Sequence, residues 1–105
     1  MIQKLKTEIW ISGYLKYLNS NCIPAYVIKK GDKGSGSVFI KVINNDNYSN
    51  VFGRVFLNYS MQWTLIAEGY EKEISEFITK QIENDSDLWL IEIEDNNLRN
   101  FLEKF

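Results

Sequence analysis

The middle of the chain carries four strand-like segments in a row, and this run constrains the fold more than any other feature. Each segment is followed by a cluster of Gly, Asn, Asp or Ser residues, which favour turns. The connections are short, which favours antiparallel neighbours joined as a meander, with residues 31–36 as a hairpin loop. We predict strands over residues 25–30, 37–43, 48–57 and 61–68.

An amphipathic helix is predicted directly after these strands, over residues 70–83. Its acidic first turn suits the positive end of the helix dipole. Residues 88–94 then predict a last strand, and residues 97–105 a short terminal helix. The apolar side chains that recur at helical spacing are Ile74, Phe77, Ile78 and Ile82.

Residues 7–21 predict another helix, which Pro24 prevents from continuing. Thr7 is a candidate N-cap residue for this helix. Ile9 lies opposite the apolar side of the helix, so a short strand over residues 6–11, followed by a shorter helix, is an open alternative. The apolar stripe consists of Ile11, Tyr14, Leu15, Leu18 and Cys22.

These elements together predict an α+β fold. We expect a single, largely antiparallel sheet, a meander of about four strands plus a C-terminal strand, with the helices packed on one face. A chain of 105 residues has room for one hydrophobic core. Residues 1–105 are therefore expected to form a single globular domain.

The composition excludes several classes of catalytic site. The chain has no histidine, which excludes Ser-His-Asp triads, Cys-His pairs and zinc sites with histidine ligands. Cys22 is the only cysteine, and we expect it to be a buried apolar residue. A chain without disulfides fits a reducing compartment, and no apolar run approaches the ~20 residues that span a bilayer. We therefore expect a cytoplasmic protein with no cofactor and no membrane partner.

Three stretches of the sequence are similar to a known family. They are residues 5–12, residues 29–32 with 36–42, and residues 85–95, whose run DSDLWLIEIED is the most distinctive. Their order and spacing resemble those of an uncharacterised bacterial family, the domain of unknown function with number 1491. Ser86 stands where that family usually has proline. The resemblance implies a small cytoplasmic bacterial protein and brings no assigned catalytic residues.

The glycine-rich loop at residues 31–36 has two interpretations. A phosphate-binding loop would end in Gly-Lys-Ser/Thr and open a helix, whose N-terminal amides hold the anion. Residues 37–43 have the pattern of a strand instead. The preferred interpretation is therefore a structural turn.

Acidic residues around the last strand offer a first alternative function. Glu92 and Glu94 point to one face of that strand, ~7 Å apart, and Asp85 and Asp87 flank it. Such a cluster can hold Mg²⁺ or Mn²⁺, or supply an acid and a base, as in a small metal-assisted hydrolase or transferase. We prefer to interpret these acids as solvated, because a strand that becomes polar toward its end usually emerges into water.

Basic and aromatic residues offer a second alternative, association with nucleic acid. An aromatic row with an interleaved cation can stack bases and contact phosphates. The acidic pI of about 5.1 argues against such a module. The candidate nucleic-acid residues are Lys29, Lys30, Lys41 and Arg54.

The preferred function follows from the strand over residues 48–57, which is apolar on both faces. A sheet that helices cover on one face must hide the other, and a second copy of the chain can do so because a two-fold axis uses the same patch twice. We therefore expect a non-enzymatic binding module that forms a homodimer, or docks on another protein, through this strand. The candidate interface residues are Tyr48, Phe52, Arg54 and Phe56.

Overall fold

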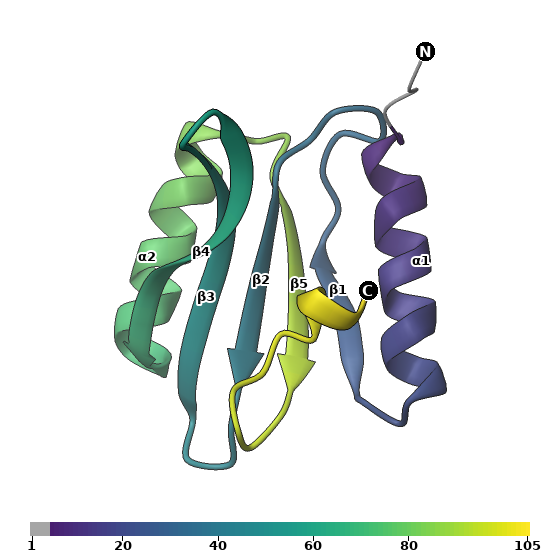
Figure 1. Ribbon diagram of the computed structural model, residues 1–105. Coiled ribbons are helices and arrows are strands. Elements are labelled where there is room, and N and C mark those ends of the chain that lie inside the picture. The colour runs from purple at the N-terminus through teal and green to yellow at the C-terminus, as the bar shows by residue number, and fades with distance from the viewer. Residues whose placement is uncertain (1–4) are drawn as a thin grey trace.

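The computed structural model describes residues 5–105, which form helices on both sides of one sheet. In chain order the elements are α1 (Thr7–Ser20), β1 (Ala25–Lys29), β2 (Val38–Ile43), β3 (Tyr48–Leu57), β4 (Ser60–Tyr70), α2 (Glu71–Asn84), β5 (Trp89–Glu94) and the 3₁₀ helix η1 (Leu102–Lys104). The five strands form an open sheet in the order β1-β5-β2-β3-β4 (Figure 1). Neither α-helix of the described residues is long and apolar enough to cross a membrane.

The predicted α+β fold with a single, largely antiparallel sheet is confirmed. β2, β3 and β4 pair antiparallel in chain order and form three of the four strands of the predicted meander. β5 lies between β1 and β2, antiparallel to β1 and parallel to β2. The prediction of a hairpin between β1 and β2 is therefore wrong, because residues 31–36 carry the chain past β5. Leu90 and Ile91, on opposite faces of β5, are both buried, as a central strand requires.

The two helices pack on opposite faces of the sheet. Ile40 and Ile91 belong to the core under α1, whereas their chain neighbours Phe39 and Leu90 pack with α2. Successive side chains of a strand point to opposite faces, so the two cores lie on either side of the sheet. The expectation that the helices share one face is therefore wrong. The signal against it is that neighbouring residues are apolar in both central strands, Phe39 with Ile40 in β2 and Leu90 with Ile91 in β5, which is typical of strands covered twice.

Each helix covers only part of its face. α1 packs over β1, β2 and β5, and α2 packs over β3 and β4 (Figure 1). Phe52 lies opposite Ile40, so its side of β3 belongs to the α1 side of the sheet. There β3 and β4 extend beyond α1 and present a set of paired side chains, which we call the open face. The open face consists of Tyr48, Asn50, Phe52, Arg54, Phe56, Met61, Trp63, Leu65, Glu68 and Tyr70.

The first turn of α1 is bound by the loop that precedes β2. The helix begins at Thr7, so the alternative of a strand over residues 6–11 is wrong. The backbone N–H groups of its first two residues donate to the carbonyl oxygens of Gly34 and Lys33. The prediction that Thr7 is the N-cap is wrong. Lys6 is the N-cap residue, and the Thr7 hydroxyl donates to the carbonyl oxygen of Gly36 at 3.0 Å. Backbone carbonyls thus satisfy helix N–H groups that a side-chain cap would otherwise bind.

Cys22 follows the end of α1. The prediction that buries its side chain is wrong, since the residue is exposed with a free thiol. The helix ends at Ser20, and the chain turns through Cys22 with a φ of 60°. The side chain therefore leaves the apolar stripe that the helical periodicity predicted.

The C-terminal segment packs on α1 and fixes its aromatic residues. Of the predicted terminal helix, only the single turn η1 forms. The fully buried Tyr14 donates its hydroxyl to the carbonyl oxygen of Asn100, and burial raises the pKa of this phenol. Phe105 lies edge-on against Trp10, with ring centroids 5.5 Å apart. These contacts hold Trp10 in place at the side of the cleft described below.

Candidate functional site

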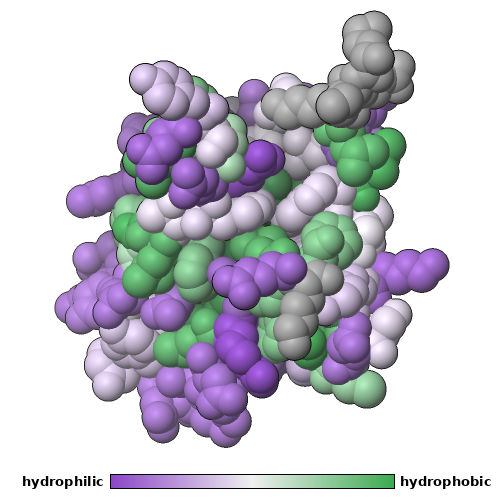
Figure 2. Space-filling view, in the orientation of Figure 1, coloured by the Kyte–Doolittle hydropathy of each residue, from purple (hydrophilic) through white to green (hydrophobic). Residues whose placement is uncertain are grey.

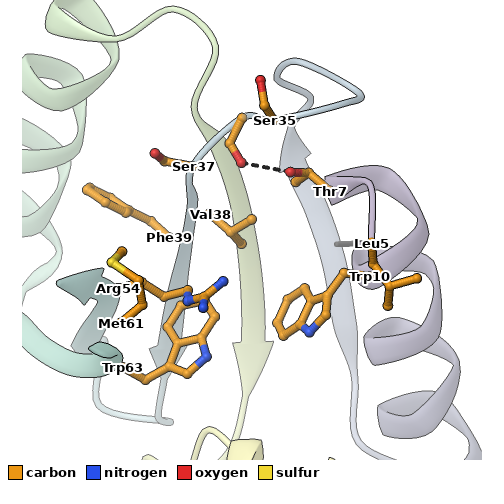
Figure 3. A pocket seen from close by; sticks show the side chains of 11 residues that line it. Leu5, Thr7, Trp10, Ser35, Ser37, Val38, Phe39, Arg54, Met61 and Trp63 are labelled. Carbon is orange, nitrogen blue, oxygen red and sulfur yellow. Dashed lines mark hydrogen bonds between the residues drawn. The ribbon is translucent and has the colours of Figure 1, made fainter. Parts of the chain in front are cut away.

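A cleft of about 510 Å³ opens on the α1 side of the sheet, between α1, the glycine-rich loop and the free end of the β3–β4 hairpin. Figure 3 shows Trp10 on one side of this cleft and Arg54, Met61 and Trp63 on the other. Val38 of β2 lies between them. Sites for small molecules usually have volumes of about 300–1,000 Å³, so this cleft has the size of a ligand site.

Two tryptophans from distant parts of the chain form its aromatic wall. Trp10 and Trp63 stack with ring centroids 5.6 Å apart and 24° between their planes. Arg54 lies opposite Trp63 in the β3–β4 register, and its guanidinium is 5.8 Å from the centre of the Trp63 ring. A two-residue turn at Asn58 and Tyr59 fixes this register, and its positive φ angles of 49° and 68° are those of a type I′ turn.

Among residues 5–105, Arg54 is the only charged side chain that lines the cleft. Among residues 5–105 no ion pair joins it to a carboxylate. A guanidinium that rests on an aromatic ring keeps N–H groups in its plane to bind a carboxylate or phosphate. The cleft therefore combines aromatic surface with a single positive charge.

The glycine-rich loop forms one end of the cleft and packs tightly against the turn before β5. A Cβ atom on Gly31 or Gly36 would lie 2.0 or 2.3 Å from the carbonyl oxygen of Asp87. Trp89 donates its indole N–H to the carbonyl oxygen of Asp32 at 2.7 Å. Gly31 and Gly36 are thus required because the backbone of the loop lies so close to the backbone of Asp87 that a Cβ atom would not fit. Together with the first turn of α1, this contact joins all three stretches that resemble the family.

The amide groups of this loop are already engaged within it. The N–H groups of Gly34 and Ser35 donate to the Asp32 carboxylate at 3.1 and 2.9 Å. These bonds, above all that from Ser35, hold the pKa of Asp32 below its usual value. The loop leads into β2 rather than into a helix. Its geometry is therefore that of a structural loop and not of a phosphate cradle.

The four predicted interface residues share one side of β3. Their surroundings differ along the strand. Phe52 packs against the α1 core, Arg54 lines the cleft, and the side chain of Phe56 is 66% exposed. Tyr48, at the other end, donates its hydroxyl to Glu68 at 2.9 Å. The open face therefore has an aromatic, cationic end at the cleft and a polar end at Tyr48.

Sequence reasoning missed the partners that β4 and α1 supply to this surface. Met61, Trp63 and Leu65 alternate along β4 and share the side of Arg54. This alternation is visible in the sequence and could have indicated a second row of the same face. The approach of Trp10 depends on how α1 packs, for which the sequence carries no local signal.

The structure does not bring the four candidate metal-binding acids together. Asp85 and Asp87 precede β5, whereas Glu92 and Glu94 lie toward its other end. The carboxylate of Glu92 lies 3.4 Å from Nζ of Lys41, a buried residue of β2. Within residues 5–105 no group of three or more potential ligands is placed to hold a metal ion.

The candidate nucleic-acid residues are also separated. Lys41 is buried on the α2 side, opposite Arg54, and its Nζ binds the carboxylate of Glu71 at 3.0 Å. Lys29 donates from Nζ to carbonyl oxygens of the turn before β5, at 2.7 and 3.0 Å. Lys30 is exposed beside it. These cations therefore do not form one continuous basic surface.

Comparison with known proteins identifies related sequences and folds. Residues 5–103 match the family model described as "Protein of unknown function (DUF1491)". The crystal structure of a DUF1491 family protein from Caulobacter crescentus CB15 is 24% identical, with a TM-score of 0.82 over 95% of this chain and 94% of that chain. An NMR structure of a DUF1491 family protein from the same organism has the same identity and a TM-score of 0.83, over 96% and 94% of the two chains.

A protein from A. tumefaciens solved in solution is also 24% identical, with a TM-score of 0.74 over 89% of this chain and 87% of that chain. At this level of identity the likeness shows a shared fold. No curated protein matches the chain. A function for the cleft and the open face has to be argued from their own geometry.

Proposed function

The chain belongs to the DUF1491 family, and we propose that it acts as a non-enzymatic binding module that pairs with a second copy of itself. The pairing surface is the outer edge of β4, where apolar side chains of the open face come to lie beside β4 of the second copy. The long and almost uncharged edge of β4, beside exposed apolar side chains, is the observation that carries this proposal.

The open face exposes several large apolar side chains. The side chains of Phe56, Met61, Leu65 and Tyr70 are 66, 50, 43 and 57% exposed, and they lie on two paired strands. Figure 2, which looks onto the α1 side, shows hydrophobic side chains gathered across the strands in the middle of this view. Contiguous apolar surface of this kind usually marks an interaction site.

The edge of β4 supports pairing with another strand. β4 is the last strand of the sheet and spans 11 residues, among which Glu68 is the only charged one and none is proline. Natural edge strands are usually protected by lysine, proline, short length or a β-bulge, and of these β4 has only the irregularity between Leu65 and Ala67. The two-residue turn closes on a hydrogen-bonded pair, Leu57 with Ser60. Hydrogen-bonded and non-hydrogen-bonded pairs alternate along antiparallel strands, so the backbone N–H groups of Met61 and Leu65 point away from β3.

A second copy of the chain fits this edge best. Two identical edge strands that run antiparallel are related by a two-fold axis, and each supplies the same apolar side chains to the other. Leu65 lies near the middle of β4, so two copies would meet there. The exposed free thiol of Cys22 suits a reducing compartment, and we place this dimer in the cytoplasm.

The test is the mass of the protein in solution. We expect sedimentation equilibrium to give a dimer of about 24.6 kDa, twice the chain mass of 12.3 kDa. Leu65→Lys places like charges opposite each other at the two-fold axis and is expected to give a monomer. Ile28→Lys is the matched control, because Ile28 is 54% exposed on β1, the other edge strand. A wild-type chain that stays at 12.3 kDa at millimolar concentration would disprove the dimer.

A further inference from the structure

We infer that the cleft between α1 and the β3–β4 hairpin binds a small planar aromatic molecule that carries an acidic group, a carboxylate or a phosphate. This site goes beyond the proposed dimer, since all of its walls come from one chain. The inference is carried by the kinds of groups that line the cleft and by the residues that hold them in place.

The cleft offers aromatic surface at fixed positions. Trp10 of α1 and Trp63 of β4 stack on each other with ring centroids 5.6 Å apart and line the cleft together with Val38 (Figure 3). Phe105 supports Trp10 edge-on, and the β3–β4 register supports Trp63. Planar aromatic ligands bind best where such rings are already in place, because little side-chain freedom is lost on binding.

Arg54 supplies the charge that defines the ligand. Its guanidinium rests over the Trp63 ring, and no carboxylate lines the cleft to neutralise it. A guanidinium binds carboxylate or phosphate oxygens in a bidentate manner, and the interaction gains strength beside apolar walls. A neutral aromatic ligand would leave this cation without a partner.

Ser37 adds a hydroxyl group at the loop end of the cleft. The loop is held there by Thr7 of α1 and by Trp89 of β5, which donate to the carbonyl oxygens of Gly36 and Asp32. A hydroxyl can donate a hydrogen bond to an oxygen of an acidic group. The cleft thus has a hydroxyl at the loop end and its charge at the aromatic wall.

The positions of the lysine side chains argue against a polyanion as the ligand. Lys29 and Lys41 bind backbone carbonyls and carboxylates elsewhere in the fold, so they cannot extend the positive surface from Arg54. A polyanion needs several cations along its length. Arg54 is the one cation that lines the cleft among the described residues, and beside two indole rings it matches a compact ligand with one acidic group.

The three tryptophans make a direct experiment possible. In ¹⁵N-labelled Leu65→Lys protein, which does not depend on the dimer, each indole N–H gives its own NMR signal. Titration with indole-3-acetate or phenyl phosphate is expected to shift the signals of Trp10 and Trp63. Trp89 is the internal control, because it does not line the cleft and its N–H is bound to Asp32, so its signal should shift much less than those of Trp10 and Trp63.

The charge requirement is tested with matched ligands and variants. Indole-3-acetamide keeps the ring and lacks the charge, and we expect it to bind at least ten-fold more weakly than indole-3-acetate. Arg54→Gln should remove that difference, whereas Lys30→Gln, a charge change outside the cleft, should keep it. The relative affinities of indole-3-acetate and phenyl phosphate tell whether carboxylate or phosphate is preferred.

Three results would overturn the inference. The first is the absence of Trp10 and Trp63 shifts with both acids, and the second is a Trp89 shift as large as theirs. The third is equal affinity for the acid and the amide in protein that retains Arg54. Each result can occur whether or not the wild-type chain dimerises, so a failure here is separate from a failure of the proposed function.

Discussion

Gly36→Ala is expected to destabilise the protein strongly, because the added methyl group meets backbone rather than a movable side chain. An alanine Cβ at this position would lie 2.3 Å from the carbonyl oxygen of Asp87 and 3.0 Å from the backbone nitrogen of Asp32. Both neighbours belong to the contact that joins the loop to β5. The loop must therefore move away from the turn before β5.

The size of the effect follows from the hydrogen bonds that this movement breaks. The indole N–H of Trp89 donates to the carbonyl oxygen of Asp32 at 2.7 Å. The backbone N–H of Asp32 donates to the carbonyl oxygen of Asp87 at 3.0 Å. The hydroxyl of Thr7 donates to the carbonyl oxygen of Gly36 at 3.0 Å. At about 1 kcal/mol for each bond, the free energy of unfolding should fall by about 3 kcal/mol. For a domain of this size the Tm should fall by about 12 °C or more.

Urea and thermal unfolding, followed by far-ultraviolet circular dichroism, measure this loss. Gly34→Ala is the matched control in the same loop, because its Cβ would meet only the Asp32 carboxylate, at an ordinary 3.6 Å. It should change the free energy of unfolding by less than about 1 kcal/mol. Equal stability of the two variants would refute the idea that close backbone approach at Gly36 holds the loop against β5.

Two further substitutions test buried hydroxyl groups. Ser49 is fully buried, and its hydroxyl has no hydrogen-bond partner among the described residues. Ser49→Ala should therefore raise the free energy of unfolding by about 1 kcal/mol. A loss of stability in urea unfolding would show that the hydroxyl is bound. Tyr14→Phe should lower the free energy of unfolding by about 1 kcal/mol at pH 7, because it removes the bond to Asn100. Burial raises the pKa of Tyr14 above the usual 10.0, so the unfolded chain loses this proton first and wild-type stability should fall as the pH rises above about 10. Unfolding curves at pH 9 and 11 should show a smaller fall for Tyr14→Phe, and an equal fall would contradict this assignment.

Local patterns in the sequence predict most of the elements. The stripe that contains Ile74 and Ile78 gives α2 within a residue or two of its bounds, and both side chains are buried. The turn signal at residues 58–60 places the β3–β4 hairpin, although the turn itself has two residues, Asn58 and Tyr59, since β4 begins at Ser60. These features depend on neighbours in the chain, which is why they can be predicted.

Contacts between distant segments account for what the sequence did not predict. The insertion of β5 beside β2 depends on pairs such as Val38 with Trp89, which no local turn encodes. With β5 in the centre, both faces of β2 need cover, and the helices separate to opposite sides. The cleft also depends on contacts between distant segments, because Trp10 reaches the side chains of β3 and β4 only when α1 packs on the sheet. The aromatic face itself was predictable, because alternation along one strand is enough to define it.

Hydrogen exchange along β4 tests the proposed pairing most directly. In an isolated chain, the amides of Gln62 and Thr64 are bound to β3 and should be protected, while those of Met61 and Leu65 point outward and should exchange rapidly. In the wild-type dimer we expect all four amides to be protected, and in Leu65→Lys only Gln62 and Thr64. Rapid exchange at Met61 and Leu65 in concentrated wild-type protein would contradict pairing along the edge of β4.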